Sequence, residues 1–217
     1  MAALFSIEGL SLALGGKEVL SIPRLEIAGG AALAFLGPNG SGKTSLLKVL
    51  ASLLPPSRGT VLFEGRPLAL QGKRSRRIVY LHQQPYIMAG SVSYNVEFGA
   101  RARGVPAAEA ARRAEGAMRL LGLAGFGRRG HRALSGGEAQ RIALARAIAS
   151  GSDVLLLDEP TASADASSRE LIARALIAQA ESGATLILAT HDGDLAAALG
   201  ARTVGLSAGM LAAGEDR

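Results

Sequence analysis

The stretch Gly37-Pro38-Asn39-Gly40-Ser41-Gly42-Lys43-Thr44 decides the fold of this chain. An apolar run over residues 31–36 precedes it, and leucines recur after it at helical spacing as far as Leu54, just before Pro55-Pro56. The apolar run predicts a buried strand, the glycines predict a turn, and the leucines predict a helix from Lys43 to Leu54. A strand, a glycine-rich turn and a helix in this order are typical of proteins with a parallel sheet covered by helices.

The same stretch fits the pattern G-x-x-x-x-G-K-[ST], in the strand-to-helix context that the pattern requires. Glycines let the backbone curl so that its N–H groups and the amino end of the helix face phosphate oxygens. Lys43 would neutralise the β- and γ-phosphates, and the Thr44 hydroxyl can ligate Mg²⁺. The alternative, a glycine-rich turn with an accidental lysine, is disfavoured by the flanking strand and helix. The sequence therefore predicts a site for nucleotide phosphates and Mg²⁺.

Two further apolar runs, residues 154–157 and 185–189, predict buried strands, and an amphipathic stretch between them predicts a crossover helix. This alternation indicates a parallel sheet. Asp158 and Glu159 follow the first of these strands, at the carboxyl end where ligands of open α/β sheets bind. Asp158 is a candidate Mg²⁺ ligand, and Glu159 is a candidate to orient and polarise an attacking water. Acidic residues often follow strands at a surface, so this assignment depends on the nearby phosphate-binding stretch.

The composition excludes several classes of protein. With 217 residues, 48% of them hydrophobic, the chain can bury a core in one domain or two small ones. No apolar run approaches the ~18 residues of a membrane-spanning helix, and no basic segment opens the chain, so we expect neither a membrane span nor a secretion signal. The lack of cysteine excludes disulfides, a thiolate nucleophile, iron–sulfur clusters and cysteine-based zinc sites.

The net charge of +6 is concentrated in the middle of the chain. Between Arg66 and Arg132 there are thirteen Lys or Arg residues and three acids, so the rest of the chain is net acidic. Such a segment suits nucleic acid or anionic lipid headgroups, but a solvated arginine-rich surface is the simpler interpretation. Alanines, arginines and glutamates from Pro106 to Leu121 predict that this middle region is a mostly helical insert.

The stretch Leu134-Ser135-Gly136-Gly137-Glu138-Ala139-Gln140-Arg141 follows the insert, and its S-x-x-E spacing predicts a capped helix that begins after Ser135. Together with Gln83, Asp165 and His191, this stretch resembles the signature of the ATP-binding-cassette ATPases, and the resemblance covers nearly the whole chain. It implies an α/β fold: a P-loop NTPase core with a parallel sheet, an N-terminal antiparallel β region and a helical insert. It also implies a single domain over 1–217, with a core of 1–84 and 134–217 and a helical subdomain over about 85–133.

The resemblance implies further that two copies of the chain pack head to tail and bury two ATP molecules between them. Each ATP would contact the phosphate-binding stretch of one copy and Ser135, Gly136, Gly137 and Glu138 of the other. Because these residues open a helix, they offer hydroxyl and N–H donors to a γ-phosphate.

Three more residues take roles from the resemblance. Gln83 would ligate Mg²⁺ and sense the γ-phosphate, His191 would hydrogen-bond that phosphate, and Asp165 would link the two ATP sites. The simpler interpretations are a surface amide for Gln83, a strand-end cap for His191 and a helix N-cap for Asp165.

The chain departs from the family at two positions. Leu14 stands where an aromatic residue usually stacks on adenine, so aliphatic packing would hold the base. Ala164 stands where leucine is common, which reduces apolar contact between the two copies. We expect weaker nucleotide binding with unchanged chemistry.

By resemblance, the chain is expected to be the cytoplasmic ATPase subunit of a transporter, held at the inner face of the membrane by transmembrane permease subunits that dock around residues 83–103. An importer is favoured because the cassette is a free-standing chain whose signature carries Glu138, and an external solute-binding protein is then expected. Because the sequence ends at Arg217, we expect it to lack the C-terminal regulatory domain of some sugar importers. The pattern from Gln83 to Asn95 is similar to that of small-anion importers of the tungstate class.

Three alternatives stay open: a nucleotide-binding subunit of an exporter, a cassette that acts on nucleic acid or the ribosome, and a small kinase. The interval between Gln83 and Ser135 is too short for the coiled-coil arm of repair cassettes, and the chain lacks the cysteines of the zinc-bearing type. We therefore expect no nucleic-acid partner. A kinase built on the phosphate-binding stretch alone would leave the signature and His191 unexplained.

Overall fold

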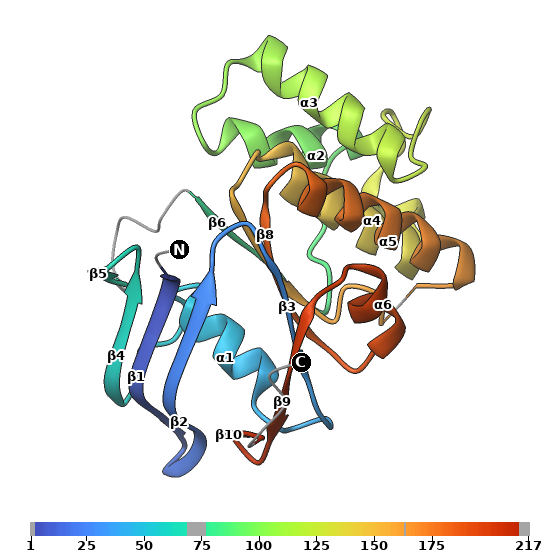
Figure 1. The fold of residues 1–217 in the computed structure, drawn as a ribbon. Coiled ribbons are helices and arrows are strands. Elements are labelled where there is room, and N and C mark those ends of the chain that lie inside the picture. The colour runs from blue at the N-terminus through green and yellow to red at the C-terminus, as the bar shows by residue number, and fades with distance from the viewer. Residues whose placement is uncertain (1–2, 69–76, 163, 213–217) are drawn as a thin grey trace.

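The computed structural model describes residues 3–68, 77–162 and 164–212, and it contains two sheets (Figure 1). The first is antiparallel, of order β2-β1-β4-β5, and consists of β1 (Ala3–Leu14), β2 (Lys17–Ala28), β4 (Arg58–Phe63) and β5 (Arg66–Pro67). Buried and exposed residues alternate along much of β1, because one face of this sheet covers the core and the other meets solvent. This sheet confirms the N-terminal antiparallel region that the resemblance implies.

The second sheet has six strands in the order β10-β9-β3-β8-β7-β6. They are β3 (Ala32–Leu36), β6 (Ile78–Leu81), β7 (Val154–Asp158), β8 (Thr185–Thr190), β9 (Arg202–Ser207) and β10 (Met210–Leu211). The strands from β9 to β6 run parallel, and β10 lies antiparallel to β9. The three strands predicted from apolar runs are β3, β7 and β8, and each has bounds within one residue of the prediction. The parallel sheet is therefore confirmed.

Helices cover both faces of the parallel sheet (Figure 1). They are α1 (Lys43–Leu50), α4 (Gly136–Ala149), α5 (Ala166–Glu181) and α6 (Gly193–Ala198). Successive residues of β3, β7 and β8 point to opposite faces and enter two separate apolar clusters. Leu33, Phe35, Val154, Leu156 and Ile187 pack with α1 and the antiparallel sheet, whereas Ala34, Leu155, Leu157, Leu186 and Leu188 pack with α4 and α5.

The helical insert is present as α2 (Val92–Arg101) and α3 (Ala107–Leu120), followed by a short 3-10 helix, η1 (His131–Ala133). Both α2 and α3 pack against α4, and residues of all three helices belong to the same apolar cluster as α5. The division of the chain at 84/85 and 133/134 stays a prediction. Among the residues that the structure describes, no helix is both long enough and apolar enough to span a membrane.

The helix α1 is shorter than its leucine spacing predicts. It ends at Leu50, because Ser52 has a φ of 56° and takes the chain out of the helical path. The N–H groups of Leu53 and Leu54 then donate to the carbonyl of Lys48, at 2.8 and 3.2 Å. Leu54 therefore packs from a turn rather than from the helix.

A buried amide joins the insert to α4. Asn95 on α2 is fully buried, and its Oδ1 accepts from the Met88 N–H at 2.8 Å and from Arg146 Nη2 at 2.7 Å. Its Nδ2 donates to the carbonyls of Met88 and Ser91, both at 2.9 Å. Arg146 also donates to the carbonyls of Tyr86 and Asn95, at 2.9 and 3.0 Å. These bonds hold the chain between Tyr86 and Ser91 against the end of α4.

Asn95→Ala should lower the free energy of unfolding by about 2 kcal/mol, because it removes a fully buried amide and leaves its part-buried partners on Met88 and Arg146 without these hydrogen bonds. Chemical denaturation measures this loss. Glu97→Ala, in the same helix but partly exposed, is the control and should change the stability by less than about 0.5 kcal/mol. Equal effects of the two substitutions would contradict the role given to Asn95.

Candidate functional site

The phosphate-binding stretch lies between β3 and α1, at the carboxyl edge of the parallel sheet. Its turn depends on glycine at Gly42, whose φ is 106° and where a Cβ would lie 2.8 Å from the Leu20 side chain. Lys43 is only 6% exposed, and its Nζ donates to the carbonyls of Gly37 and Pro38 at 2.6 and 3.1 Å. The lysine charge is thus held inside the loop.

This loop borders a cavity of about 360 Å³. The cavity is lined by Val19, residues 39–45, Gln83 and Glu159. Inside the loop, the Ser41 hydroxyl is buried and has no hydrogen-bond partner among the described residues. A buried hydroxyl without a partner is costly unless a ligand oxygen satisfies it. The cavity therefore fits a group that carries phosphate oxygens.

Two hydroxyls hold the carboxylate of Asp158, the last residue of β7. Thr44 Oγ1 donates to its Oδ1 at 2.9 Å, and the Tyr80 hydroxyl donates to its Oδ2 at 2.8 Å. Burial, and then the bond to Asp158, raise the pKa of the Tyr80 hydroxyl far above its ordinary value, so it stays a donor. The described residues contain no cluster of three His, Cys, Asp or Glu side chains that could bind a metal alone. One carboxylate and one hydroxyl, completed by phosphate oxygens, nevertheless suit Mg²⁺.

Glu159 follows Asp158 in a strained backbone conformation, with a φ of 46°. Its side chain is buried, and its carboxylate lies 3.0 Å from His191 Nδ1. Thr190 Oγ1 donates to the same carboxylate at 3.3 Å and accepts the Asp192 N–H at 3.0 Å. The end of β8 thus orients a carboxylate that lines the phosphate cavity.

The structure brings together most of the residues predicted for the ATP phosphates. Lys43, Thr44, Gln83 and Glu159 line one cavity, with Asp158 and His191 in direct contact with two of them. Val19 and Ser45 also line this cavity and Tyr80 contacts Asp158 beside it, and sequence inspection missed all three. Tyr80 is placed there by the pairing of β6 with β7, Val19 lies on β2, and no motif marks either residue.

Leu14, the signature and Asp165 are not among the described residues that line this cavity. Leu14 ends β1 and is 43% exposed. Asp165 is the N-cap of α5, as its simpler interpretation predicted, and accepts from the Ser168 N–H at 2.7 Å. That bond is the main reason why the pKa of Asp165 is lowered. Ser163 lies outside the described residues.

The predicted capping box at the signature is confirmed. The Glu138 N–H donates to Ser135 Oγ at 3.2 Å, and Glu138 Oε2 accepts the Ser135 N–H at 2.8 Å. Glu138 Oε1 also accepts from Arg129 at 2.9 Å. The Ser135 N–H bond first, and then Arg129, lower the pKa of Glu138. The Ser135 hydroxyl accepts this bond through its oxygen, so its proton stays available for a ligand.

A groove of about 410 Å³ lies between β6, α2 and α4. Its walls combine exposed aromatic residues, among them Tyr86 and Phe98, with the cationic side chains of Arg103 and Arg146. The groove overlaps the stretch 83–103 in which the sequence predicts a docking surface. Burial lowers the pKa of Arg146, whose guanidinium still carries its charge at neutral pH.

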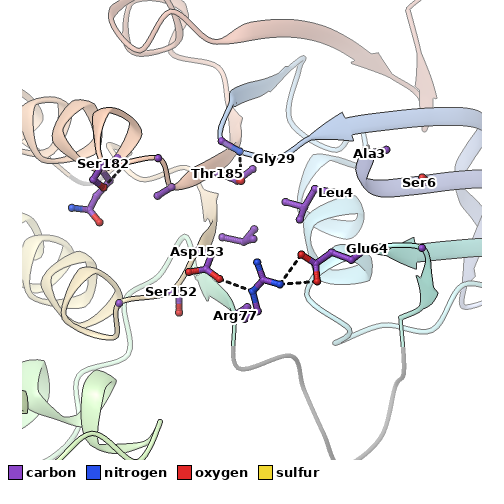
Figure 2. A pocket seen from close by; sticks show the side chains of 17 residues that line it. Ala3, Leu4, Ser6, Gly29, Glu64, Arg77, Ser152, Asp153, Ser182 and Thr185 are labelled. Carbon is purple, nitrogen blue, oxygen red and sulfur yellow. Dashed lines mark hydrogen bonds and ion pairs between the residues drawn. The ribbon is translucent and has the colours of Figure 1, made fainter. Parts of the chain in front are cut away.

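A larger cavity, of about 1100 Å³, lies at the opposite, amino end of the parallel strands and is shown in Figure 2. Arg77 crosses it and donates to Asp153 at 2.5 Å and to both carboxylate oxygens of Glu64 at 2.6 Å. These ion pairs tie the antiparallel sheet to the parallel one. The phosphate-binding stretch is not among the described residues that line this cavity.

A glycine-rich phosphate loop, a carboxylate pair after a buried strand and a capped signature helix define an ATP-binding cassette. In agreement, the family model described as ABC transporter matches residues 20–162, more than half of the chain. The chain belongs to this family. The matched region contains the phosphate-binding stretch, Gln83, the signature and both carboxylates.

Curated relatives and solved structures agree with this assignment. The Fe(3+) ions import ATP-binding protein FbpC of Streptomyces coelicolor is 38% identical over 97% of this chain and 61% of its own length. The sulfate/thiosulfate import ATP-binding protein CysA of Caulobacter vibrioides is 39% identical over 95% of this chain and 62% of its own. The chain thus spans about three fifths of the length of these relatives.

Among solved structures, cbiO1 of Clostridium perfringens, part of the ABC transporter complex cbiONQ, has a TM-score of 0.85 at 29% identity. The alignment covers 100% of this chain and 89% of that one. The dimeric structure of MJ0796, a bacterial ABC transporter cassette, has a TM-score of 0.85 at 25% identity and covers 98% and 99%. These likenesses confirm the predicted α/β cassette fold.

Because its folded-state pKa is lowered, ionised Glu138 should stabilise the protein above its unfolded pKa of about 4.3, and this contribution should fade as the pH falls through the lower folded value. Glu138→Gln keeps a capping side chain but cannot titrate. The wild-type protein should therefore lose stability more steeply than Glu138→Gln below pH 5, as measured by denaturation across pH. If the stability of the two proteins fell equally steeply with pH, the role given to ionised Glu138 would be wrong.

Proposed function

We propose that the chain binds ATP with Mg²⁺ and hydrolyses it to power a membrane transporter. One observation carries this proposal: a single cavity at the carboxyl edge of the sheet presents Lys43, Thr44, Gln83 and Glu159 to the same space. Phosphoryl transfer to water requires positive charge at the β- and γ-phosphates, a bound metal ion and an oriented water molecule. The cavity has a side chain suited to each requirement.

The proposed roles follow from the contacts. Lys43 and the N–H groups of residues 39–44 bind the phosphates, and the partnerless Ser41 hydroxyl donates to a phosphate oxygen. Thr44 and Asp158 hold Mg²⁺, which neutralises charge on the phosphates when bound. Gln83, exposed at the cavity wall, completes this side of the site.

Glu159 is the proposed base for the attacking water. His191 and Thr190 fix its carboxylate from one side, and its strained backbone aims it into the cavity. A hydrogen bond from the second ring nitrogen of His191 to the γ-phosphate, made together with the one to Glu159, requires a proton on each ring nitrogen. Water activation by a positioned carboxylate contributes about 10²–10⁴ to the rate.

A second copy of the chain is proposed to complete each ATP site. The hydroxyl of Ser135 and the N–H groups of Gly136 and Gly137 lie at the start of α4, where Glu138 completes the capping box. These residues are not among the described ones that line the phosphate cavity, so their donors can bind a nucleotide held by another copy. Asp165 would then lie between the two sites. The dimeric MJ0796 cassette, with the same fold, supports this arrangement.

Permease subunits are the proposed partners at the groove beside α2. Exposed Tyr86 and Phe98 offer apolar contacts, and a short helix of a membrane protein fits a groove of this kind. The names of FbpC and CysA support an import system. An external solute-binding protein, and a place on the inner face of the membrane through the permease, are proposed with it. In this view the helical subdomain, about 85–133, carries the docking surface.

The proposed cargo is a small inorganic anion. The sulfate/thiosulfate relative supports this class, whereas the iron relative would favour a cation. Tungstate is the particular anion that the sequence pattern favours. Leu14, exposed near the end of its strand, is proposed to contact adenine by aliphatic packing.

Lys43→Ala should weaken Mg-ATP binding by more than about tenfold, because it removes a charged donor from the phosphate loop. Calorimetric titration measures the change. Lys48→Ala, on the same helix but in its last turn, is the control and should bind as the wild type does. If folded Lys43→Ala protein bound Mg-ATP as tightly as the wild type, the assignment of this loop to phosphate binding would be wrong.

Glu159→Gln should retain ATP binding and reduce hydrolysis by about 10²–10⁴. The dimer should then persist, so light scattering with Mg-ATP should show monomers converting to dimers. Glu181→Gln, at the exposed end of α5, should hydrolyse ATP normally. A Glu159→Gln protein that stays monomeric at saturating ATP, alone and with its permease, would rule out the shared site.

A further inference from the structure

The turn between β9 and β10 lies against the phosphate-binding stretch. Ser207 pairs with Met210, so Ala208 and Gly209 form a two-residue hairpin turn. Both have a positive φ, 48° and 81°, as a type I′ turn requires. Asparagine, aspartate or glycine is preferred at the first of these positions, so the backbone of Ala208 is strained. Such a conformation persists only where contacts outside the hairpin hold it.

The backbone of Gly209 makes these outside contacts. Its N–H donates to the carbonyl of Ser41 in the phosphate-binding stretch at 2.9 Å, and its carbonyl accepts the N–H of Ser21 on β2 at 2.8 Å. A Cβ at this position would lie 2.5 Å from the carbonyl oxygen of Val19, so the approach to β2 requires glycine. One residue thus joins the phosphate-binding stretch to β2, beside which β10 lies (Figure 1).

Both segments that Gly209 joins contribute to the phosphate cavity, through Val19 and Ser41. The Ser41 hydroxyl is the buried group without a hydrogen-bond partner, and the N–H of the same residue donates to the Pro38 carbonyl at 3.2 Å. The bond from Gly209 holds the Ser41 carbonyl. Because both backbone groups of Ser41 are held, its hydroxyl has a fixed position relative to β2.

We propose that Gly209 is a positioning residue for nucleotide binding, which holds Ser41 against β2 so that the Ser41 hydroxyl is oriented before a phosphate arrives. This inference rests on the proposed function, because it requires that the loop bind the phosphates of a nucleotide. Gly209 is not among the described residues that line the cavity, so it acts through Ser41. A loop that is ordered in advance binds its ligand more tightly, because less ordering is left for the binding step.

The first test crowds the turn. Gly209→Ala places a Cβ against Val19 and should raise the Kd for Mg-ADP at least about threefold, the lower range for loss of one hydrogen bond. Calorimetric titration measures this Kd without turnover. Because the Ser41 hydroxyl binds phosphate in the ground state and in the transition state alike, KM for ATP should rise while kcat stays close to that of the wild type.

Gly65→Ala is the matched control. Phe63 pairs with Arg66, so Glu64 and Gly65 form the corresponding two-residue turn between β4 and β5, with φ values of 50° and 71°. A Cβ at Gly65 would meet no atom within 4 Å, so this substitution strains the backbone without crowding a neighbour. Both variants should lose stability, but only Gly209→Ala should lose affinity for Mg-ADP. A wild-type Kd in folded Gly209→Ala protein, or an equal loss in the control, would overturn the proposal.

The second test asks whether the effect passes through the Ser41 hydroxyl. Ser41→Ala removes this hydroxyl and should itself weaken Mg-ADP binding. When Gly209→Ala is added to Ser41→Ala, the further rise in Kd should be smaller than the rise that Gly209→Ala causes in the wild type, because the effects of coupled residues are not additive. If the two effects were additive, the turn would not act through Ser41 and the proposal would be wrong.

The third test uses the unchanged chain, so it does not depend on the folding of a variant. If the Gly209 bond favours nucleotide binding, nucleotide must favour that bond to the same degree. Saturating Mg-ADP should therefore slow hydrogen exchange of the Gly209 amide at least about threefold, as measured by NMR. The Glu64 amide, which donates to the Leu4 carbonyl at 2.8 Å in the corresponding turn, is the control and should keep its rate. An unchanged rate at Gly209, or equal slowing at both amides, would contradict the proposal.

The outcomes separate two failures. A wild-type chain that binds neither Mg-ADP nor a non-hydrolysable ATP analogue contradicts the proposed function itself. A wild-type chain that binds both, with a Kd that Gly209→Ala leaves unchanged, contradicts only the role given to Gly209.

Discussion

The register of three parallel strands is the constraint on which the rest of the structure depends. Leu36 of β3 lies beside Thr190 of β8, and Asp158 of β7 lies beside Ala189. Every residue of β7 and β8 is buried, so polar side chains can reach a ligand only where these strands end. Because the ends coincide, a loop after β3, the acids at and just after the end of β7 and a histidine after β8 meet at one edge. A slip by one residue would turn each strand's apolar side chains to the opposite face and separate these groups.

The sequence predicted this central part well for a physical reason. Strands buried on both faces appear as uninterrupted apolar runs, and residues 154–157 and 185–189 are of this type. Glycines and a lysine after the first strand mark the phosphate loop in the same direct way. The capping box at Ser135 and the N-cap at Asp165 were also visible, because caps depend on residues only a few positions apart.

Other parts of the fold and site could not be read in this way. The helix α1 was predicted to reach Leu54, yet the left-handed Ser52 ends it earlier, and no proline or glycine announces that turn. Tyr80 reaches the site through the pairing of β6 with β7, two strands far apart in sequence, and Val19 lines the cavity from β2; a local pattern contains neither relation. Asn95 gave no signal either, because its partners come from α4 and from a loop.

Glu159 shows how the protein maintains an unfavourable conformation. A glutamate with a φ of 46° costs on the order of 1–3 kcal/mol, and a buried carboxylate adds to this cost. Bonds from His191 and Thr190 offset part of it, and the Asp192 N–H fixes Thr190 in turn. The backbone strain is therefore confined to Glu159, and the bonds that offset it come from residues at the end of β8.

The helix α4 has a mechanical consequence. Its first turn contains the residues of the signature, and Arg146 in its last turn donates hydrogen bonds to the carbonyls of Tyr86 and Asn95. Fourteen helical residues span about 21 Å, and a helix of this length held at both ends behaves as a stiff rod. A displacement of the segment that follows Gln83 would therefore act on the end of α4 opposite the signature. In the proposed dimer, the angle at which one copy offers its donors to another would thus depend on contacts at the opposite end of the helix.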